Sequence, residues 1–363
     1  MKVKIKSVNK KNDYYITEIY TESFYPDGKG GQLGDRGFIG NSEIKEVISA
    51  DKLILSAELE TDKEYDFNED TERKEDISVQ HTAQHVLSAV LNDRYNAYTE
   101  SFRMSENYST IDINKEVTDE ELKNTEKIIF ELIQKNIPVN ELTAEKEEAV
   151  KLHLRKPISD KVTGKVRIIE IPGIDISACG GYHVKNISQL SIVKTIKKER
   201  VKGGLTRIYF LAGKRALDDY DKKTHVFSQL SLLLSCPTEE IYEKSAELNE
   251  KFIAIKNENK KLTENICYLI GKNPDEYIKG KNILFYPEDD DVAKNLFRFT
   301  DLNKYILITF SGGSYSIFSE KYDLTEILNK LKSEYSVKGG GNKSRINIKG
   351  EITPEILFEA IKK

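Results

Sequence analysis

Two short stretches concentrate the side chains that bind metal ions most readily. The first carries His81 and His85, four residues apart, and the second carries Cys179 and His183, also four apart. Three of the five histidines and one of the three cysteines of the chain therefore lie in these stretches. Imidazole nitrogens and a thiolate are ligands that a tetrahedral ion of the Zn²⁺ type accepts. We predict that these four side chains bind one Zn²⁺ ion.

The elements that must position these ligands differ between the two stretches. Apolar residues recur at helical spacing over residues 78–92, which contain neither Gly nor Pro, so this segment is predicted to be a helix. At about 100° per residue, His81 and His85 share one helix face, nearly opposite the apolar stripe. The pair Gly180–Gly181 predicts a sharp turn between two strands. The site therefore requires a helix and a distant turn to converge.

Other interpretations of the histidines explain less. Two solvated histidines on a helix would account for His81 and His85 alone, but not for a second ligand pair. The motif of zinc proteases has Glu directly after its first His, whereas Thr82 stands at that position here. His153 and His225 are predicted to be solvated surface side chains.

Residues 81–85 and 179–184 resemble the editing domain of alanyl-tRNA synthetases, and more closely its free-standing relatives, the AlaX trans-editing proteins. Further stretches agree with that family in the same order, at residues 24–37, 109–113 and 203–208. Several motifs in series are far more specific than any one of them. The resemblance implies hydrolysis, in trans, of tRNA for alanine that carries the wrong amino acid, typically serine.

An aminoacyl ester is intrinsically labile, so such a site needs a placed water and charge stabilisation more than a strong nucleophile. Cys179 is then expected to be a thiolate ligand of the metal and not a covalent catalyst. Four protein ligands form a closed set, whereas a catalytic zinc usually keeps one position open. The ion would either expand its coordination, exchange a ligand for water, or mainly orient the substrate.

Polar residues near the motifs are the remaining candidates for the site. Thr82 and Gln84 are the expected catalytic groups. The residues expected to contact the substrate are Gly30, Gly31, Gln32, Ser101, Arg103 and Tyr182. A group that hydrogen-bonds a serine hydroxyl would reject correctly charged alanine. Tyr182 departs from the family, which commonly has Thr there, so its phenol is expected to narrow the pocket or replace a hydroxyl contact.

Residues 30–32 read Gly-Gly-Gln, which allows three interpretations. One is a plain hairpin turn, and another is a wall where backbone N–H groups approach the end of the tRNA. Release factors use the same tripeptide to hydrolyse peptidyl-tRNA, but a three-residue match is nearly uninformative. The flanking Tyr25–Pro26 and Gly34–Asp35 fit the editing family better.

Charge is nearly balanced along the 363 residues, with 56 basic and 60 acidic side chains and a formal net charge of -4. Because no basic field covers the whole molecule, the expected partner, tRNA, must be held by local patches. The predicted contacts are Lys202 and Arg207 after the metal turn, and Lys338, Lys343 and Arg345 in a Gly-rich segment near the carboxy terminus.

The pattern of elements predicts an α+β chain in four parts. Short strands and tight turns indicate a small β-barrel in residues 1–75, and residues 76–213 are expected to form a mixed α+β zinc-binding editing domain. One helix of that domain is predicted over residues 143–156. A helical arm follows in 214–273, and 274–363 form a small α/β domain. This last part resembles the carboxy-terminal domain of alanyl-tRNA synthetases, which certain phosphoesterases share.

The helical arm contains a heptad pattern. One register holds Ile241, Leu248, Ile255, Leu262 and Leu269, and the other holds Phe252 and Ile266, with Ser245 and Asn259 as polar interruptions. This pattern fits either a helical hairpin or an intermolecular coiled coil. A homodimer through the arm or the carboxy-terminal domain is the partner expected from the second interpretation.

The chain is expected to be cytoplasmic. Three cysteines far apart indicate a reducing compartment, and the amino terminus has no apolar signal-peptide block. The sequence contains no run of about 18 apolar residues, so no membrane span is predicted. Everything before His81 is a short β region without a segment for amino acid activation, so a complete synthetase is not expected.

Two alternatives of other classes remain at this point. The chain could be a tRNA-binding or regulatory module with a structural zinc and no hydrolysis. It could also be a zinc hydrolase of a small ester or amide, in which case the protein would not retain tRNA.

Overall fold

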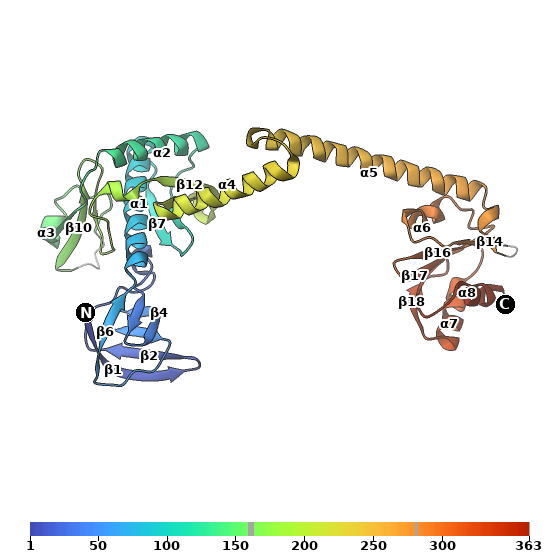
Figure 1. Cartoon of the computed structure of the whole chain (residues 1–363), viewed down its shortest axis with the longest axis horizontal. Coiled ribbons are helices and arrows are strands. Elements are labelled where there is room, and N and C mark those ends of the chain that lie inside the picture. Colours follow the sequence, from blue (N-terminus) through green and yellow to red (C-terminus); the bar gives the residue numbers. More distant parts are fainter. Residues whose placement is uncertain (159–162, 280–281, 363) are drawn as a thin grey trace. The chain divides into compact units, whose positions relative to one another are not determined.

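The computed structural model of the chain describes residues 1–158, 163–279 and 282–362. The chain forms two compact units, Met1–Val226 and Phe227–Lys363. Both units contain helices as well as strands, which confirms the mixed α+β expectation (Figure 1). Among the described residues, no helix is both long and apolar enough to cross a membrane.

The first part of the chain closes into a six-stranded barrel, as expected. Its strands pair in the order β1-β2-β5-β4-β3-β6. They are β1 (Lys2–Lys11), β2 (Tyr14–Ile19), β3 (Gly37–Ile39), β4 (Ser42–Ser49), β5 (Lys52–Leu55) and β6 (Glu64–Glu69). Alternating apolar residues such as Val3 and Ile5 are buried inside it. The connection between β2 and β3 carries the glycine-rich segment, residues 28–36, which reaches the metal-binding side chains.

Helix α1 (Thr71–Tyr95) follows the barrel directly. Asp70 caps its first turn by accepting a hydrogen bond from the Arg73 N–H, and Asn96 ends it in the left-handed conformation. The helix predicted over residues 78–92 is therefore confirmed. Its second half is buried on the polar face as well as on the apolar one, so both histidines are covered by protein.

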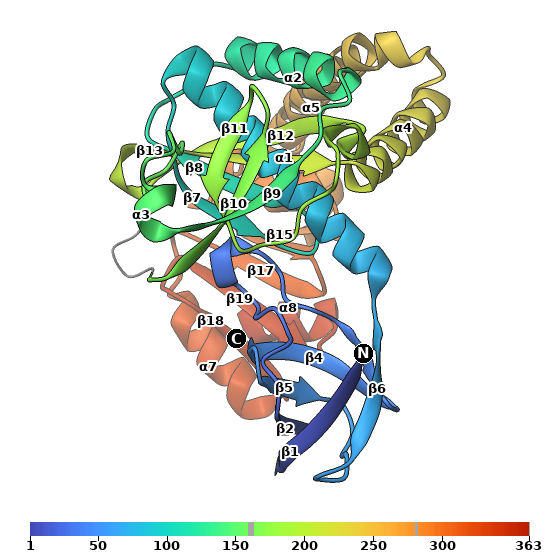
Figure 2. The same ribbon diagram turned by 90° about the vertical axis from the view of Figure 1, so that its left-hand side faces the viewer.

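Two antiparallel sheets complete the first unit (Figure 2). The four-stranded sheet has the order β12-β13-β8-β7, and the three-stranded sheet has the order β11-β10-β9. The strands are β7 (Thr99–Met104), β8 (Ser109–Ile113), β9 (Asn140–Glu145), β10 (Lys165–Ile171), β11 (Asp175–Ala178), β12 (Val193–Val201) and β13 (Leu205–Ala212). Helix α2 (Asp119–Gln134), α1 and the four-stranded sheet share one apolar core.

The helix predicted over residues 143–156 is wrong. Strand β9 occupies Asn140–Glu145 and pairs with β10 along its whole length, and helix α3 spans only Lys146–Ala149. Leu142 lies opposite Ile168 and Ala144 lies opposite Val166. Pairing with a neighbouring apolar strand therefore outweighs the local helix preference of a Glu- and Lys-rich segment.

The second unit is a six-stranded mixed sheet with helices. Helix α4 (Lys214–Leu234) crosses the division between the units, and α5 (Ile241–Lys272) follows it. The sheet has the order β14-β15-β16-β17-β19-β18. Its strands are β14 (Ile278–Lys279), β15 (Ile283–Tyr286), β16 (Ile306–Ser311), β17 (Ser314–Phe318), β18 (Val337–Gly341) and β19 (Arg345–Gly350). The helices are α6 (Asp291–Asn295), α7 (Leu324–Glu334) and α8 (Pro354–Lys362).

Candidate metal centre

The four predicted ligands come together in the first unit. His81 and His85 extend from α1, and Cys179 and His183 from the turn that follows β11. One ligand atom from each side chain lies within 4.8 Å of the others. The Sγ atom of Cys179 lies 3.4 Å from Nε2 of His81 and 3.3 Å from Nε2 of His183. The set of three imidazoles and one thiol fits the preferences of Zn²⁺.

Each imidazole uses its other nitrogen, Nδ1, to contact a second residue. His81 lies 2.7 Å from the amide oxygen of Gln32, and His85 lies 2.7 Å from a carboxylate oxygen of Asp175. His183 lies 3.1 Å from the hydroxyl of Thr82. Such partners fix the orientation and tautomer of histidine ligands in metal sites.

The partners determine where the protons are. The amide and carboxylate oxygens can only accept, so Nδ1 of His81 and of His85 must carry hydrogen. Thr82 donates its own hydrogen to the Ser78 carbonyl at 2.8 Å and therefore accepts from His183. Nε2 is then the atom through which each imidazole would bind an ion at the centre.

Electrostatics favour a thiolate at Cys179. Burial alone would raise the pKa of this thiol, but the close contacts of Sγ with the imidazoles of His183, His81 and His85 outweigh burial and lower the pKa to about 2. Burial would lower the pKa of His85, but the bond to Asp175 raises it to about 9. Binding of a cation at Nε2 would release that proton. Burial lowers the pKa of His183 to about 3.

The metal turn, residues 179–183, has little room for other side chains. A Cβ atom on Gly181 would lie 2.2 Å from Cε1 of His81 and 2.6 Å from the amide oxygen of Gln32. Gly180 has no atom within 4 Å of the same position. Arg167 holds the turn from β10 by donating to the carbonyls of Cys179 and Gly181 at 3.0 and 2.7 Å. Glycine is thus required at one of the two positions.

The glycine-rich segment packs against this turn. Gln32 is fully buried, and besides contacting His81 it accepts from the Tyr182 N–H at 2.8 Å. Gly31 has a φ of 78°, and a Cβ atom there would lie 2.2 Å from the Phe102 carbonyl oxygen. Gly30, with a φ of 60°, precedes it. The segment therefore supports the centre directly from the barrel side.

Three residues that were predicted to be catalytic or to contact the substrate lie near the histidines, but their polar groups contact other atoms than Nε2 of the ligands. Thr82 contacts Nδ1 of His183, as described. The Gln84 side chain is buried and donates to the Ser88 hydroxyl at 2.9 Å. The Tyr182 hydroxyl donates to Asp35 at 2.9 and 3.1 Å, toward the barrel.

Ser101 and Arg103 lie on the other face of the four-stranded sheet. Between them, the Phe102 ring stacks on His81 with a centroid distance of 5.2 Å, and neighbouring side chains in a strand point to opposite faces. Ser101 donates instead to Asp112 at 2.7 Å. The structure therefore does not bring these two side chains to the candidate ligands.

The residues predicted to contact tRNA are distributed over both units. Arg207 forms two hydrogen bonds with Asp112, at 2.7 and 2.9 Å, while Lys202 is exposed beside it. In the second unit, Lys343 lies 3.4 Å from Asp323. The guanidinium of Arg345 lies 5.1 Å from the centre of the Phe318 ring, and Lys338 is exposed on β18.

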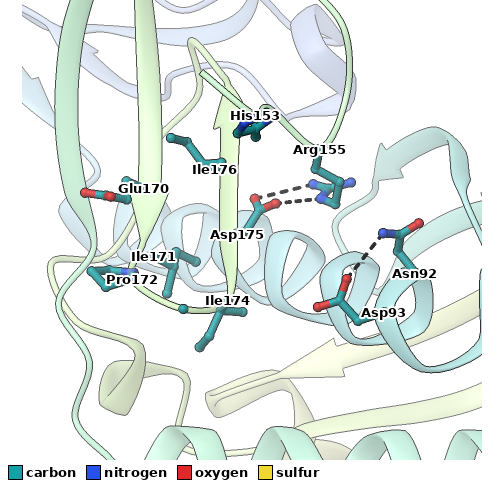
Figure 3. A pocket seen from close by; sticks show the side chains of 11 residues that line it. Asn92, Asp93, His153, Arg155, Glu170, Ile171, Pro172, Ile174, Asp175 and Ile176 are labelled. Atoms are coloured by element: carbon teal, nitrogen blue, oxygen red, sulfur yellow. Dashed lines mark hydrogen bonds and ion pairs between the residues drawn. The ribbon is translucent and has the colours of Figure 1, made fainter. Parts of the chain in front are cut away.

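Sequence reasoning missed a chain of charged residues behind His85. Asp175 accepts from His85 and from Ser177 at 3.0 Å. It also accepts from Arg155 at 2.6 Å (Figure 3). Its side chain is completely buried. Arg155 lines a cavity of about 390 Å³ together with His153 and Glu170. The available signal was a pair of polar residues two apart, Asp175 and Ser177, in the short strand that ends directly before Cys179.

Comparison with known proteins agrees with the motifs. The family described as the threonyl and alanyl tRNA synthetase second additional domain matches residues 166–209. The chain is 27% identical to the alanyl-tRNA editing protein AlaX-L of Pyrococcus horikoshii, over 98% of this chain and 93% of that protein. It is 30% identical to Aarsd1-A of Xenopus laevis, also an alanyl-tRNA editing protein, over 69% of this chain and 61% of the relative. Alanine–tRNA ligase of Methanococcus aeolicus is 28% identical, with 37% of its length covered.

Proposed function

Because the chain belongs to the family of free-standing alanyl-tRNA editing proteins, we propose that it hydrolyses mischarged tRNA for alanine in trans, at a zinc site. Seryl-tRNA for alanine is the proposed substrate. The observation that carries the proposal is the convergence of three Nε2 atoms and one thiol, each imidazole having its Nδ1 bound elsewhere.

The residues present fit a zinc ion. His81, His85, Cys179 and His183 would hold it, with the thiolate providing one negative charge. A bound Zn²⁺ ion supplies Lewis acidity, which polarises an ester carbonyl and makes a nearby water more acidic. Gln32, Thr82 and Asp175 orient the three imidazoles and keep their lone pairs directed at the centre.

Other residues form the wall of the site. The phenyl ring of Phe102 stacks on His81 and excludes water from that side. Gly31 lets the barrel backbone approach β7 closely at Phe102, next to His81, and Gly30 precedes it, so backbone groups of this segment can approach the acylated end of the tRNA. Gln84, a buried side-chain amide on α1, could hydrogen-bond a substrate hydroxyl.

The test is a deacylation assay with the full chain and bound zinc. Seryl-tRNA and alanyl-tRNA for alanine are supplied separately, and the free amino acid is measured. We expect the seryl ester to be hydrolysed on the order of 100-fold faster, because a site that bonds a hydroxyl rejects a substrate without one. Equal rates would contradict the specificity.

Two variants test whether hydrolysis depends on the candidate metal centre. Cys179→Ala removes a ligand and should abolish hydrolysis, whereas Cys236→Ala, in the second unit, should not change the rate. Hydrolysis that survives Cys179→Ala at the full rate would contradict a role for the centre in the reaction.

One observation favours a second candidate function. Four protein ligands would complete the shell of a tetrahedral ion, as in structural zinc sites. A tRNA-binding module with a structural zinc would retain tRNA and zinc but hydrolyse neither ester. The same assay separates the two functions, since zinc-loaded protein without activity on either substrate would support the module.

We also propose that α5 pairs with a second copy of the chain. The heptad side chains Leu248, Phe252, Ile255, Leu262, Ile266 and Leu269 are exposed on this helix. With Asn259 as a polar interruption, they form a seam of the kind that coiled coils bury, and such a polar residue selects one register. A second copy presents the same seam and is therefore the expected occupant.

A further inference from the structure

The three histidines of the metal centre are not held alike. The Nδ1 atom of His85 faces a carboxylate, that of His81 faces a neutral amide oxygen, and that of His183 faces a hydroxyl. A charged acceptor forms a stronger hydrogen bond than a neutral one and makes the imidazole a better ligand. Of the three, His85 is therefore the ligand held most firmly.

Asp175 is itself fixed from the opposite side. Arg155 donates from Nε to Oδ1 at 2.6 Å, and Ser177 donates to both oxygens, while Oδ2 receives His85 at 2.7 Å. The backbone N–H of Arg155 bonds the Ile176 carbonyl at 2.9 Å, which ties the arginine to β11. Figure 3 shows the guanidinium directed at the carboxylate beside the cavity. Arg155 therefore keeps the carboxylate aligned with His85.

His183 has the weakest support. Its contact with Thr82, at 3.1 Å, is the longest of the three. The same hydroxyl already donates to the Ser78 carbonyl and accepts from the Val184 N–H at 3.1 Å, so it is shared among three groups. His183 is also partly exposed, whereas His81 and His85 are each only 3% exposed.

The space around the imidazole also differs between His81 and His183. His81 is enclosed by Gln32, by the Phe102 ring and by Gly181, whose backbone leaves no room beside the imidazole. His183 belongs to the turn that also contains Gly180, which has open space where a side chain would project. Movement of one ligand away from the centre is thus easiest at His183.

We propose that His183 is the replaceable ligand of the centre, while Cys179 and His85, the latter fixed through Asp175 by Arg155, keep the ion in place. This inference rests on the proposed zinc site and resolves how a closed set of four ligands admits a substrate. Displacement of His183, the partly exposed ligand, would free one coordination position while the other three side chains continued to hold the ion. Arg155 and Asp175 are positioning residues in this arrangement.

The first test compares ligand variants of the full chain by their affinity for Zn²⁺, measured by competition with a chromophoric chelator. His183→Ala should lose at least about tenfold less affinity than His85→Ala, in line with the size of effects of supporting residues in metal sites. Co²⁺ bound to His183→Ala should show an absorption spectrum changed by an added water ligand. An equal or larger loss of affinity for His183→Ala would overturn the proposal.

A second pair of variants leaves all four ligands intact. Arg155→Gln removes the charge that fixes Asp175 and should weaken Zn²⁺ binding about tenfold and shift the Co²⁺ spectrum. His153→Gln lines the same cavity without contacting Asp175 and should change neither measurement. Circular dichroism verifies that each variant is folded. A folded Arg155→Gln variant with unchanged affinity and spectrum would contradict the positioning role.

The outcomes distinguish this inference from the proposed function. Failure of the unmodified chain to bind Zn²⁺ would contradict both. Zinc binding with deacylation, but with His85→Ala and His183→Ala equally impaired, would contradict only the unequal roles of the ligands.

Discussion

The phenol hydroxyl of Tyr182 donates to the Asp35 carboxylate at 2.9 and 3.1 Å, joining the metal turn to the barrel's glycine-rich segment. Lys74 lies 4.5 Å from the centre of the same ring. Burial raises the pKa of Tyr182, and Asp35 raises it further, so the hydroxyl keeps its proton at neutral pH. Tyr182 thus has a structural partner that a smaller side chain such as Thr could not reach in the same way.

Tyr182→Phe keeps the ring and removes this hydrogen bond. We expect a loss of about 1 kcal/mol in the free energy of unfolding, the usual effect of one such bond. Urea unfolding of the zinc-bound protein measures it. Tyr220→Phe, an exposed tyrosine on α4, is the control and should change nothing. Equal stability of both variants would show that the bond to Asp35 does not join the two parts.

The two glycines of the metal turn should respond very differently to alanine. Gly181→Ala places a methyl group 2.2 Å from the His81 ring and must displace it, so Zn²⁺ affinity should fall at least about tenfold. Gly180→Ala projects into open space and should leave affinity within about twofold of the unmodified protein. The Zn²⁺ affinity of both variants is measured by competition with a chelator. Similar affinities would mean that the turn does not pack on His81 as described.

Stability in acid should depend on Asp27. Burial alone would raise the pKa of this carboxyl, but hydrogen bonds from Arg36, Val47 and Gly34 hold it below its usual value. Because the unfolded carboxyl titrates near pH 3.9, the unfolded chain binds more protons as the pH falls through that range. The stabilisation is therefore present above about pH 4 and lost below it.

Asp27→Asn provides the measurement. The difference in unfolding free energy between the unmodified chain and the variant should be largest near pH 6 and shrink as the pH falls below about 4. Urea titrations of chelator-treated protein at several pH values exclude a contribution from the metal. A difference independent of pH would contradict the lowered pKa.

Self-association should depend on the seam of α5. Ile255→Lys places a charge at a heptad position that is exposed on the helix, and should convert a dimer into a monomer. Glu250→Lys changes charge on the outer side of the same helix and should leave the dimer intact. Light scattering coupled to size-exclusion chromatography reports the mass of each. A monomeric unmodified chain at micromolar concentration would contradict the pairing.

The sequence alone indicated the ligands and the barrel because both depend on local patterns. Histidines four residues apart on a helix, and a Cys and a His around two glycines, are visible within five residues. Alternating apolar residues with Gly-rich turns indicated the short strands of the barrel. These signals do not require knowledge of which distant segments meet.

The supporting residues could not be predicted in the same way. Gln32 and His81 are 49 residues apart, and Asp175 and His85 are 90 residues apart, so only the fold shows that they touch. The helix over residues 143–156 failed for a related reason, because β10 pairs with residues 140–145. Ser101 is near the motifs in sequence but on the far face of its strand, since a shift of one residue reverses the direction of a side chain.

The two hydrogen bonds to the amide oxygen of Gln32 affect the order of assembly. They join a loop of the barrel to positions 49 and 150 residues later, and contacts between such distant segments form late when a chain folds. A cation would therefore bind with full affinity only after the barrel, helix α1 and the turn at residues 179–183 have packed together. The absorption that appears when Co²⁺ binds would therefore report when the last step of folding occurs. A design that transfers the helix and the turn to another protein would also have to include Gln32.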